Sequence, residues 1–233
     1  MSRWRAALPL LLLVATGIVL FSSGAFDRLS PTNLVADQDM LHAMVAASPV
    51  STRLAFIGLL TMAVSTGIPG TVVIIFAGGL MFGLVDGAIC STIGLVLGSL
   101  LLFLASRYAF GAGSKHPPLL VERLRHGFGS HPVSYTLFLR LVPVLPFGGM
   151  TVALAWLRCP LWLFLGATAA GGAVTTVFET SIGAGLDVAM AQGQPLDASL
   201  LLNHHVLIPM GALALLALLP LLVGRLRGRP RSP

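Results

Sequence analysis

The stretch RLVPVLPFGG, which begins at Arg140, places one charged residue, two prolines and two glycines inside an otherwise apolar part of the sequence. A guanidinium is costly in such a place unless it meets water, a carboxylate or a phosphate. Pro143 and Pro146 lack a backbone donor, and with Gly148 and Gly149 they open the backbone into a turn that can face an anion. Because a guanidinium offers paired donors in a fixed geometry, Arg140 predicts a site for a lipid phosphate. The alternative is an interfacial arginine that reaches the head groups.

A turn of the same kind occurs earlier, where STGIPG, residues 65–70, interrupts another apolar run. Its Gly67, Pro69 and Gly70 open the backbone in the same way. We assign these three residues to the same predicted substrate-binding site as the turn that follows Arg140.

Glu179 is an acidic residue inside a later apolar stretch. Because removal from water favours the neutral form of a carboxyl group, Glu179 is a candidate for carrying a proton. Arg140 is its expected partner. The alternative is a carboxyl group without a role in transport.

Other residues are assigned structural roles. Asp86 is expected to complement the positive end of a helix, and Arg107 and Arg158 to mark the cytoplasmic edge of apolar segments. Glycine recurs at every fourth position, a spacing that lets helices approach closely in lipid, at Gly79, Gly83 and Gly87. This glycine face fits either packing within the chain or a homodimer.

The composition sets the class of protein. Of the 233 residues 56% are hydrophobic and 9% are charged, which excludes a soluble domain and indicates a membrane protein with several spans. The formal charge of +6 comes mostly from basic runs beside apolar segments, so it indicates orientation in the membrane and no nucleic-acid partner. The two cysteines have no metal-ligand spacing, and no metal or other cofactor is expected.

The apolar signal divides into residues 6–26, 54–108, 135–157, 160–186 and 204–224. The basic segments predict that both termini and the loop at 109–134 lie in the cytoplasm. Residues 1–26 are interpreted as a retained span rather than a cleaved signal peptide.

Two of these stretches are broken. The run from residue 54 is interrupted after about a dozen residues, too few to cross a bilayer. Residues 54–83 therefore predict a re-entrant hairpin on the outer side, followed by a crossing helix from Leu84 to Tyr108. Residues 135–157 predict a second hairpin on the cytoplasmic side, followed by a crossing helix over 160–186.

The predicted fold is all-α, a polytopic integral membrane protein with four crossing spans and two inverted re-entrant helical hairpins. Its core covers residues 51–188, with repeat halves 51–108 and 135–188, between an N-terminal part, 1–50, and a C-terminal span with a basic tail, 189–233. Inverted repeats with interrupted helices indicate a transport site near the midplane. The alternative is that proline and glycine only kink ordinary spans.

Two motifs resemble the DedA superfamily, also called the VTT-domain or SNARE-associated Golgi protein family. GIPGTVVIIFAGGLMFGLVDGAICSTIGLVLGSLLLFLASRYAFG is similar to that family's first half, and RLVPVLPFGGMTVALAWLRCP to its second motif. On the return from the second turn this chain has Thr151 and Ala155, where Golgi-type members often carry Asn and Gly. The resemblance implies two facing re-entrant hairpins and the flipping or scrambling of phospholipids or polyprenyl-phosphate carriers.

The expected function is movement of an anionic phospholipid or polyprenyl-phosphate lipid between leaflets, with membrane lipids as partners and no enzymatic reaction. No phosphate loop, nucleophile elbow or metalloprotease motif occurs in the sequence. Two alternatives are a non-transporting protein that supports envelope integrity or division, and an ion-coupled transporter of small solutes. The expected location is the bacterial inner (plasma) membrane.

Overall fold

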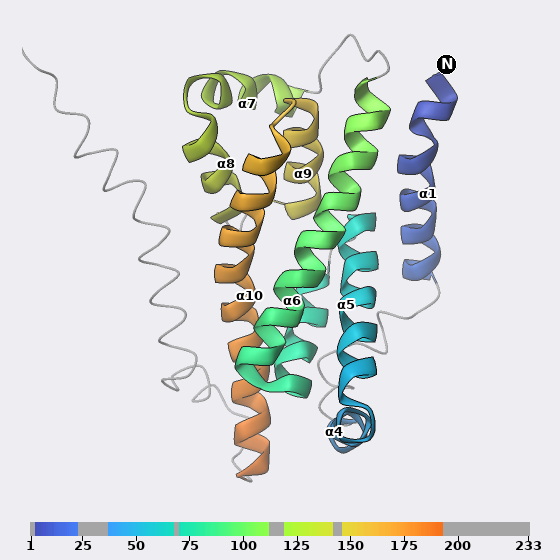
Figure 1. Ribbon diagram of the computed structural model, residues 1–233, viewed down its shortest axis with the longest axis vertical. Helices are drawn as coiled ribbons and strands as arrows, with labels where there is room; N and C mark the ends of the chain where they lie inside the picture. The colour runs from blue at the N-terminus through green and yellow to red at the C-terminus, as the bar shows by residue number, and fades with distance from the viewer. Residues whose placement is uncertain (1–2, 23–36, 68–69, 112–118, 142–145, 193–233) are drawn as a thin grey trace, which may run out of the picture.

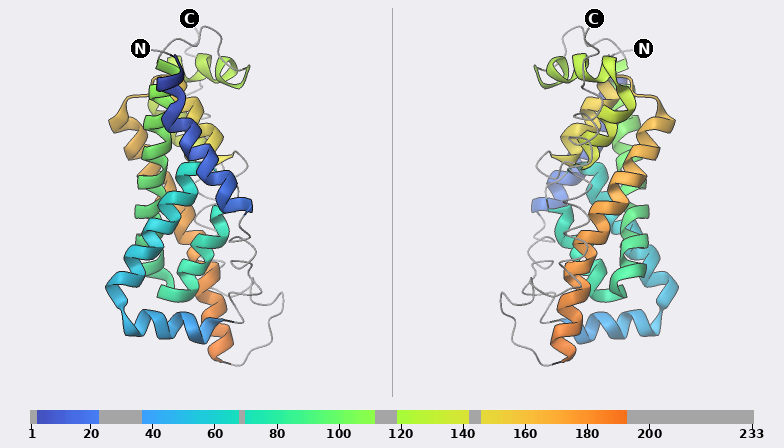
Figure 2. Two further views of the ribbon diagram at one scale, coloured as in Figure 1. Left: turned by 90° about the vertical axis from the view of Figure 1, so that its right-hand side faces the viewer. Right: turned by 90° about the vertical axis from the view of Figure 1, so that its left-hand side faces the viewer.

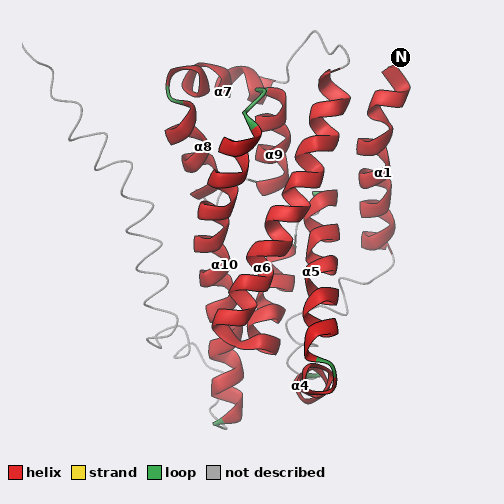
Figure 3. Cartoon of the chain, viewed as in Figure 1, coloured by secondary structure: helices red, strands yellow, loops and turns green. Residues whose placement is uncertain are grey.

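The computed structural model describes a helical bundle (Figure 1) over residues 3–22, 37–67, 70–111, 119–141 and 146–192. Every regular element in these ranges is a helix (Figure 3), as the composition predicts. The helices are α1 (Arg3–Ser22), α4 (Gln38–Ala47), α5 (Pro49–Thr66), α6 (Thr71–Gly111), α7 (Leu119–Ser130), α8 (Pro132–Leu141), α9 (Phe147–Trp156) and α10 (Leu161–Ala191). The predicted last span and basic tail lie outside the described residues.

Three of the described helices are long and apolar enough to cross a membrane, namely α5, α6 and α10. One expectation is therefore wrong. Helix α5 begins at Pro49 rather than at residue 54, and its 18 residues are not too short for a crossing. Proline suits the first turn of a helix, where its missing N–H is no loss, and this extends the helix beyond the apolar run.

Helix α6 consists of two helices that meet at Gly83, whose backbone has φ 76° and ψ −175°. A positive φ is open to glycine at little cost, so the chain reverses here without a loop. Residues 71–82 run antiparallel to both α5 and the later part of α6 (Figure 1). The sequence predicted that a hairpin ends at residue 83 and that a crossing helix begins at Leu84. The break at Gly83 lies at this boundary.

Asp86 lies in the first turn after this break, where a carboxylate complements the helix end. Its Oδ2 atom is 2.5 Å from Nη2 of Arg53, near the start of α5. Arg53 also lies over the ring of Phe82, 5.7 Å from its centroid. Through these contacts, Arg53 links the start of α5 to the residues on either side of Gly83.

The second half of the bundle also consists of two helices separated by a break and followed by a long helix. Helix α8 ends at Leu141, α9 begins at Phe147, and a tight turn leads from α9 into α10. The break between α8 and α9 falls in the predicted motif. In Figure 1, α8 and α9 occupy the upper half of the bundle, whereas α5 and residues 71–82 extend from its lower end.

Helices α6 and α10 form the centre of the bundle (Figure 1). A Cβ atom at Gly79 would overlap the backbone carbonyl of Thr180, and one at Gly183 would overlap that of Phe76. Part of the glycine face therefore packs within the chain. Close to this contact, the hydroxyl groups of Thr92 and Thr176 are hydrogen bonded at 2.8 Å.

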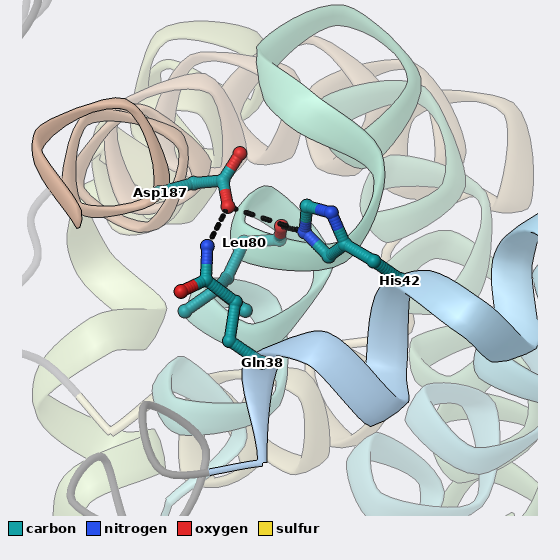
Figure 4. Close-up of polar contacts among 4 residues, drawn as sticks. All are labelled: Gln38, His42, Leu80 and Asp187. Carbon is teal, nitrogen blue, oxygen red and sulfur yellow. Dashed lines mark hydrogen bonds and ion pairs between the residues drawn. The ribbon is translucent and has the colours of Figure 1, made fainter. Parts of the chain in front are cut away.

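Two helices lie across the ends of the bundle (Figure 2), α4 at one end and α7 at the other. Three polar contacts hold α4 against the bundle (Figure 4). His42 Nε2 is 3.1 Å from both the Leu80 carbonyl and Asp187 Oδ1, and Gln38 donates to the same carboxylate. These contacts join α4 to the end of α10 and to residues 71–82. They also bring together residues that are far apart in the sequence.

Candidate functional site

The two chain reversals predicted from the glycines and prolines meet inside the bundle. Gly67 caps the C-terminus of α5 with a left-handed backbone, φ 69°. Gly148 lies in the first turn of α9, and a Cβ atom there would be 3.1 Å from the Cα atom of Gly67. The segments that carry these glycines approach from opposite ends of the bundle, and a side chain at position 148 would require one of them to shift by a few tenths of an ångström.

Arg140 lies in the last turn of α8 and is 4% exposed. It is the only charged side chain in the buried core of the described residues. Its backbone packs closely on α10, where a Cβ atom at Gly171 would be 2.8 Å from Arg140 Cβ. Glycine at position 171 thus admits the α8 helix that carries the guanidinium.

Arg140 Nη1 donates a hydrogen bond of 3.1 Å to Thr151 Oγ1 on α9. The Thr151 hydroxyl in turn donates to the carbonyl of Phe147, one helical turn earlier, at 2.9 Å. This second bond fixes the hydroxyl proton away from the guanidinium, so a lone pair faces Arg140.

Two aromatic rings lie against the guanidinium. Its central carbon is 4.4 Å from the ring centroid of Phe147 and 4.9 Å from that of Phe164 on α10. Phe164 stacks on Phe103 of α6, with centroids 4.1 Å apart. These contacts are favourable for a guanidinium, and they join the three helices α6, α9 and α10 around Arg140.

The Nε and Nη2 atoms of Arg140 are buried and have no hydrogen-bond partner among the described residues. Leaving donors of a charged group unpaired in this way is expensive. Within the described residues, the site therefore holds two nitrogens with unpaired N–H groups and one positive charge, beside the place where Gly67 and Gly148 approach each other. This arrangement is suited to an oxyanion.

Glu179 is not the partner of Arg140, and that expectation is wrong. Within the described ranges, Glu179 makes no ion pair or hydrogen bond, and Arg140 makes no ion pair. The physical reason is their separation along α10. Arg140 packs at Gly171, two helical turns before Glu179, which is about 12 Å along the axis.

The remaining residues that the sequence singled out do not all lie beside Arg140. Gly149 is in the first turn of α9, where its nearest neighbour is the Pro146 ring, and Gly70 follows the first turn with φ 112°. Pro69 and Pro143 lie outside the described residues. Arg158 follows α9 with φ 57°. Arg107, expected at a membrane edge, donates a 2.8 Å hydrogen bond to the Cys159 carbonyl.

Sequence reasoning missed Thr151 and Phe164 as neighbours of Arg140, and Phe103 as the residue that stacks on Phe164. Phe164 lies seven residues before Gly171, a spacing that puts both on the same face of α10. This spacing alone does not identify Phe164 as a neighbour of Arg140, because it must first be known that α8 packs on α10 at Gly171. The role of Thr151 follows from its spacing of four residues from Phe147.

We expect Thr151→Val to lower the unfolding free energy by about 1–3 kcal/mol, because Nη1 of the buried guanidinium would lose its acceptor. The measurement is thermal or denaturant unfolding of the purified protein in detergent. Thr175→Val is the control, since the Thr175 hydroxyl bonds to carbonyls of its own helix at 3.0 and 3.3 Å. An equal loss in both variants would contradict the assigned role of Thr151.

One known protein family matches the sequence. The sequence model of the VTT domain matches residues 68–185, more than half of the chain, and this range includes the α8–α9 turn, Arg140 and Glu179. No curated protein and no solved structure matches the chain. On the match to the VTT domain, the chain belongs to the VTT-domain family of membrane proteins, the DedA and SNARE-associated Golgi protein family.

Proposed function

We propose that this protein moves an anionic phospholipid or polyprenyl-phosphate lipid between the two leaflets of the membrane. In this proposal, α5 with residues 71–82 and α8 with α9 are re-entrant hairpins that enter from opposite sides. The close approach of Gly67 and Gly148 supports it, since the turns then lie within the bilayer. Non-helical backbone is tolerated at that depth only where protein or a polar cavity surrounds it.

The single observation that carries the proposal is the buried Arg140 with two unpaired donors. An arginine with structural duties alone would be expected to use its donors within the protein. A lipid phosphate would supply both the missing acceptors and the missing negative charge. The first-turn amides of a helix have no partner within that helix, so the N-terminus of α9 also favours an anion near the same place.

Transport requires the site to open, because the two free nitrogens are closed off from solvent. We propose that this is an occluded form, in which the head group enters when the α8–α9 hairpin separates from its neighbours. Only a few side chains then need to move, since Phe147 and Thr151 are both on α9. The lipid chains would remain in the bilayer while the head group passes the two turns.

The orientation follows from charge. Arg123 and Arg125 on α7 favour a cytoplasmic position for that end of the bundle under the positive-inside rule. The opposite end carries Asp39 on α4 and Asp187 on α10. We propose a multi-pass protein of the inner membrane with its α4 end on the outer side.

Reconstitution tests the proposal directly. Purified protein in liposomes that contain fluorescent phospholipid, or fluorescent polyprenyl phosphate, should increase the fraction of probe accessible to a membrane-impermeant quencher. Protein-free liposomes and liposomes with an unrelated helical membrane protein are the controls. Equal rates in all three samples would contradict lipid transport and favour a structural role in the envelope.

Glu179 offers a second measurable outcome. It is partly buried on α10 and has no ion pair within the described residues, which suits a group that binds and releases a proton. We expect Glu179→Gln to transport lipid at the same rate with and without a proton gradient, whereas the wild type responds to the gradient. Asp187→Asn, at the end of α10, is the control and should keep the wild-type response. A gradient response in Glu179→Gln equal to that of the wild type would contradict proton coupling through this residue.

A further inference from the structure

The space around the Arg140 guanidinium is not equally available on all sides. Its central carbon lies over the rings of Phe147 and Phe164, 4.4 and 4.9 Å from their centroids, so a ligand cannot occupy the space that these rings fill. The in-plane edge is where the N–H groups point, and hydrogen bonds need this direction. A ligand must therefore approach in the plane of the guanidinium.

The two unpaired nitrogens share one edge of that plane. In an arginine, Nη1 lies on the side of Cδ, and Nη2 lies on the side to which the Nε–H points. The Nε–H and one Nη2–H are consequently parallel, whereas Nη1 is the atom that donates to Thr151. The free donors form a single two-pronged fork that fits two oxygens of one phosphate or carboxylate group.

The charge at the site is one unit. Arg140 is the only charged residue in the buried core of the described part of the chain, and the five residues between α8 and α9, VPVLP, carry no charge in the sequence. Glu179 does not pair with it, and Arg107 is exposed at the end of α6 and donates to a carbonyl. A second negative charge on the ligand would remain uncompensated in an apolar interior, which is costly.

The geometry points to a lipid phosphodiester, a group with one negative charge and two equivalent terminal oxygens, bound edge-on by Nε and Nη2 of Arg140. This inference rests on the proposed function and narrows its substrate class. A phosphate monoester, including a polyprenyl phosphate, carries about 1.5 to 2 negative charges near neutral pH and fits less well.

A matched pair of lipids tests the inference. Phosphatidylmethanol and phosphatidic acid with the same fluorescent chains differ by one methyl group on the phosphate, which makes the first a diester and the second a monoester. In liposomes at about pH 7.5, we expect protein-dependent transport of phosphatidylmethanol to be at least about tenfold faster than that of phosphatidic acid. Near pH 5, below the second pKa of about 6 for a phosphate monoester, this ratio should fall towards one.

The outcomes separate this inference from the proposed function. Transport of phosphatidic acid at a rate equal to or above that of phosphatidylmethanol at pH near 7.5 would overturn the diester assignment while lipid transport stands. Absence of protein-dependent transport for both lipids, and for polyprenyl phosphate, would overturn the proposed function and the inference with it.

A variant tests the fork itself. Arg140→Lys keeps the positive charge but replaces two parallel donors with a single ammonium group. We expect it to reduce phosphatidylmethanol transport at least about tenfold, while Arg53→Lys, at the other end of the first hairpin, retains the wild-type rate. Wild-type transport by Arg140→Lys would show that charge alone is sufficient and would contradict edge-on binding.

Discussion

Arg140→Met should reduce lipid transport at least about a hundredfold and leave the protein as stable as the wild type, or more stable. The transport loss follows from two charge-assisted hydrogen bonds to the phosphate, at about 1.5–3 kcal/mol each. Every 1.4 kcal/mol corresponds to about a tenfold change in rate. Initial rates of probe movement in liposomes, at matched protein density, provide the measurement.

The expected stability of Arg140→Met distinguishes a phosphate-binding role of Arg140 from a structural one. A purely structural residue would lower both transport and stability when it is replaced. Here the wild-type protein buries a guanidinium with two unpaired nitrogens, and replacing such a charge with an apolar side chain of similar length is often neutral or stabilising. Methionine also keeps favourable contacts with the Phe147 and Phe164 rings. Full transport by Arg140→Met would refute the phosphate-binding role.

Gly183→Ala should destabilise the bundle by about 1–3 kcal/mol or more, although it adds a single methyl group. That methyl group would overlap the carbonyl oxygen of Phe76, a backbone atom that no rotamer change can move. Helices α6 and α10 would have to separate, and the Thr92–Thr176 hydrogen bond beside the contact would be strained. Gly79→Ala should act similarly through the Thr180 carbonyl.

The test is thermal unfolding in detergent together with the yield of monodisperse protein. Gly166→Ala is the matched control on the same helix, because no atom lies within 4 Å of the added Cβ. Alanine favours helix over glycine by about 0.8–1.0 kcal/mol in an exposed position, so this variant should be neutral or slightly stabilised. Because Gly79 and Gly183 belong to one helix crossing, the double variant should lose less than the sum of the two single losses. Wild-type stability of Gly183→Ala would contradict the crossing.

Much of the fold was predictable because a membrane imposes strong local rules. The breaks in STGIPG and PVLPFGG reflect proline and glycine chemistry, which acts over a few residues and is visible in the sequence. The start of α5 was missed for a local reason too. Helix α5 begins with PVSTR, in which Ser51, Thr52 and Arg53 are polar, so hydropathy alone placed the start of the element too late.

The site was only half predictable. Arg140 stands out because a charge in an apolar stretch is rare, but its neighbours are set by helix packing over long sequence distances. The pairing with Glu179 failed because the depth at which α8 meets α10 depends on the glycine at position 171, and no local pattern gives that register. The same reason explains why Phe164 was not expected beside the guanidinium, nor Phe103 stacked on Phe164.

The reversal at Gly83 has a consequence for the lipid environment. Residues 71–82 extend about 18 Å from Gly83 to the first turn, and the ten residues of α9 extend about 15 Å from the second turn to the other end of the bundle. If these segments lie roughly along the membrane normal, their sum is close to the ~30 Å of a typical hydrocarbon core. Neither segment has a long loop at its outer end, because residues 71–82 meet the rest of α6 directly at Gly83 and α9 joins α10 through a tight turn. Hydrophobic mismatch should therefore act on the contact between the turns, so that activity depends on acyl-chain length and is highest in a bilayer of matching thickness.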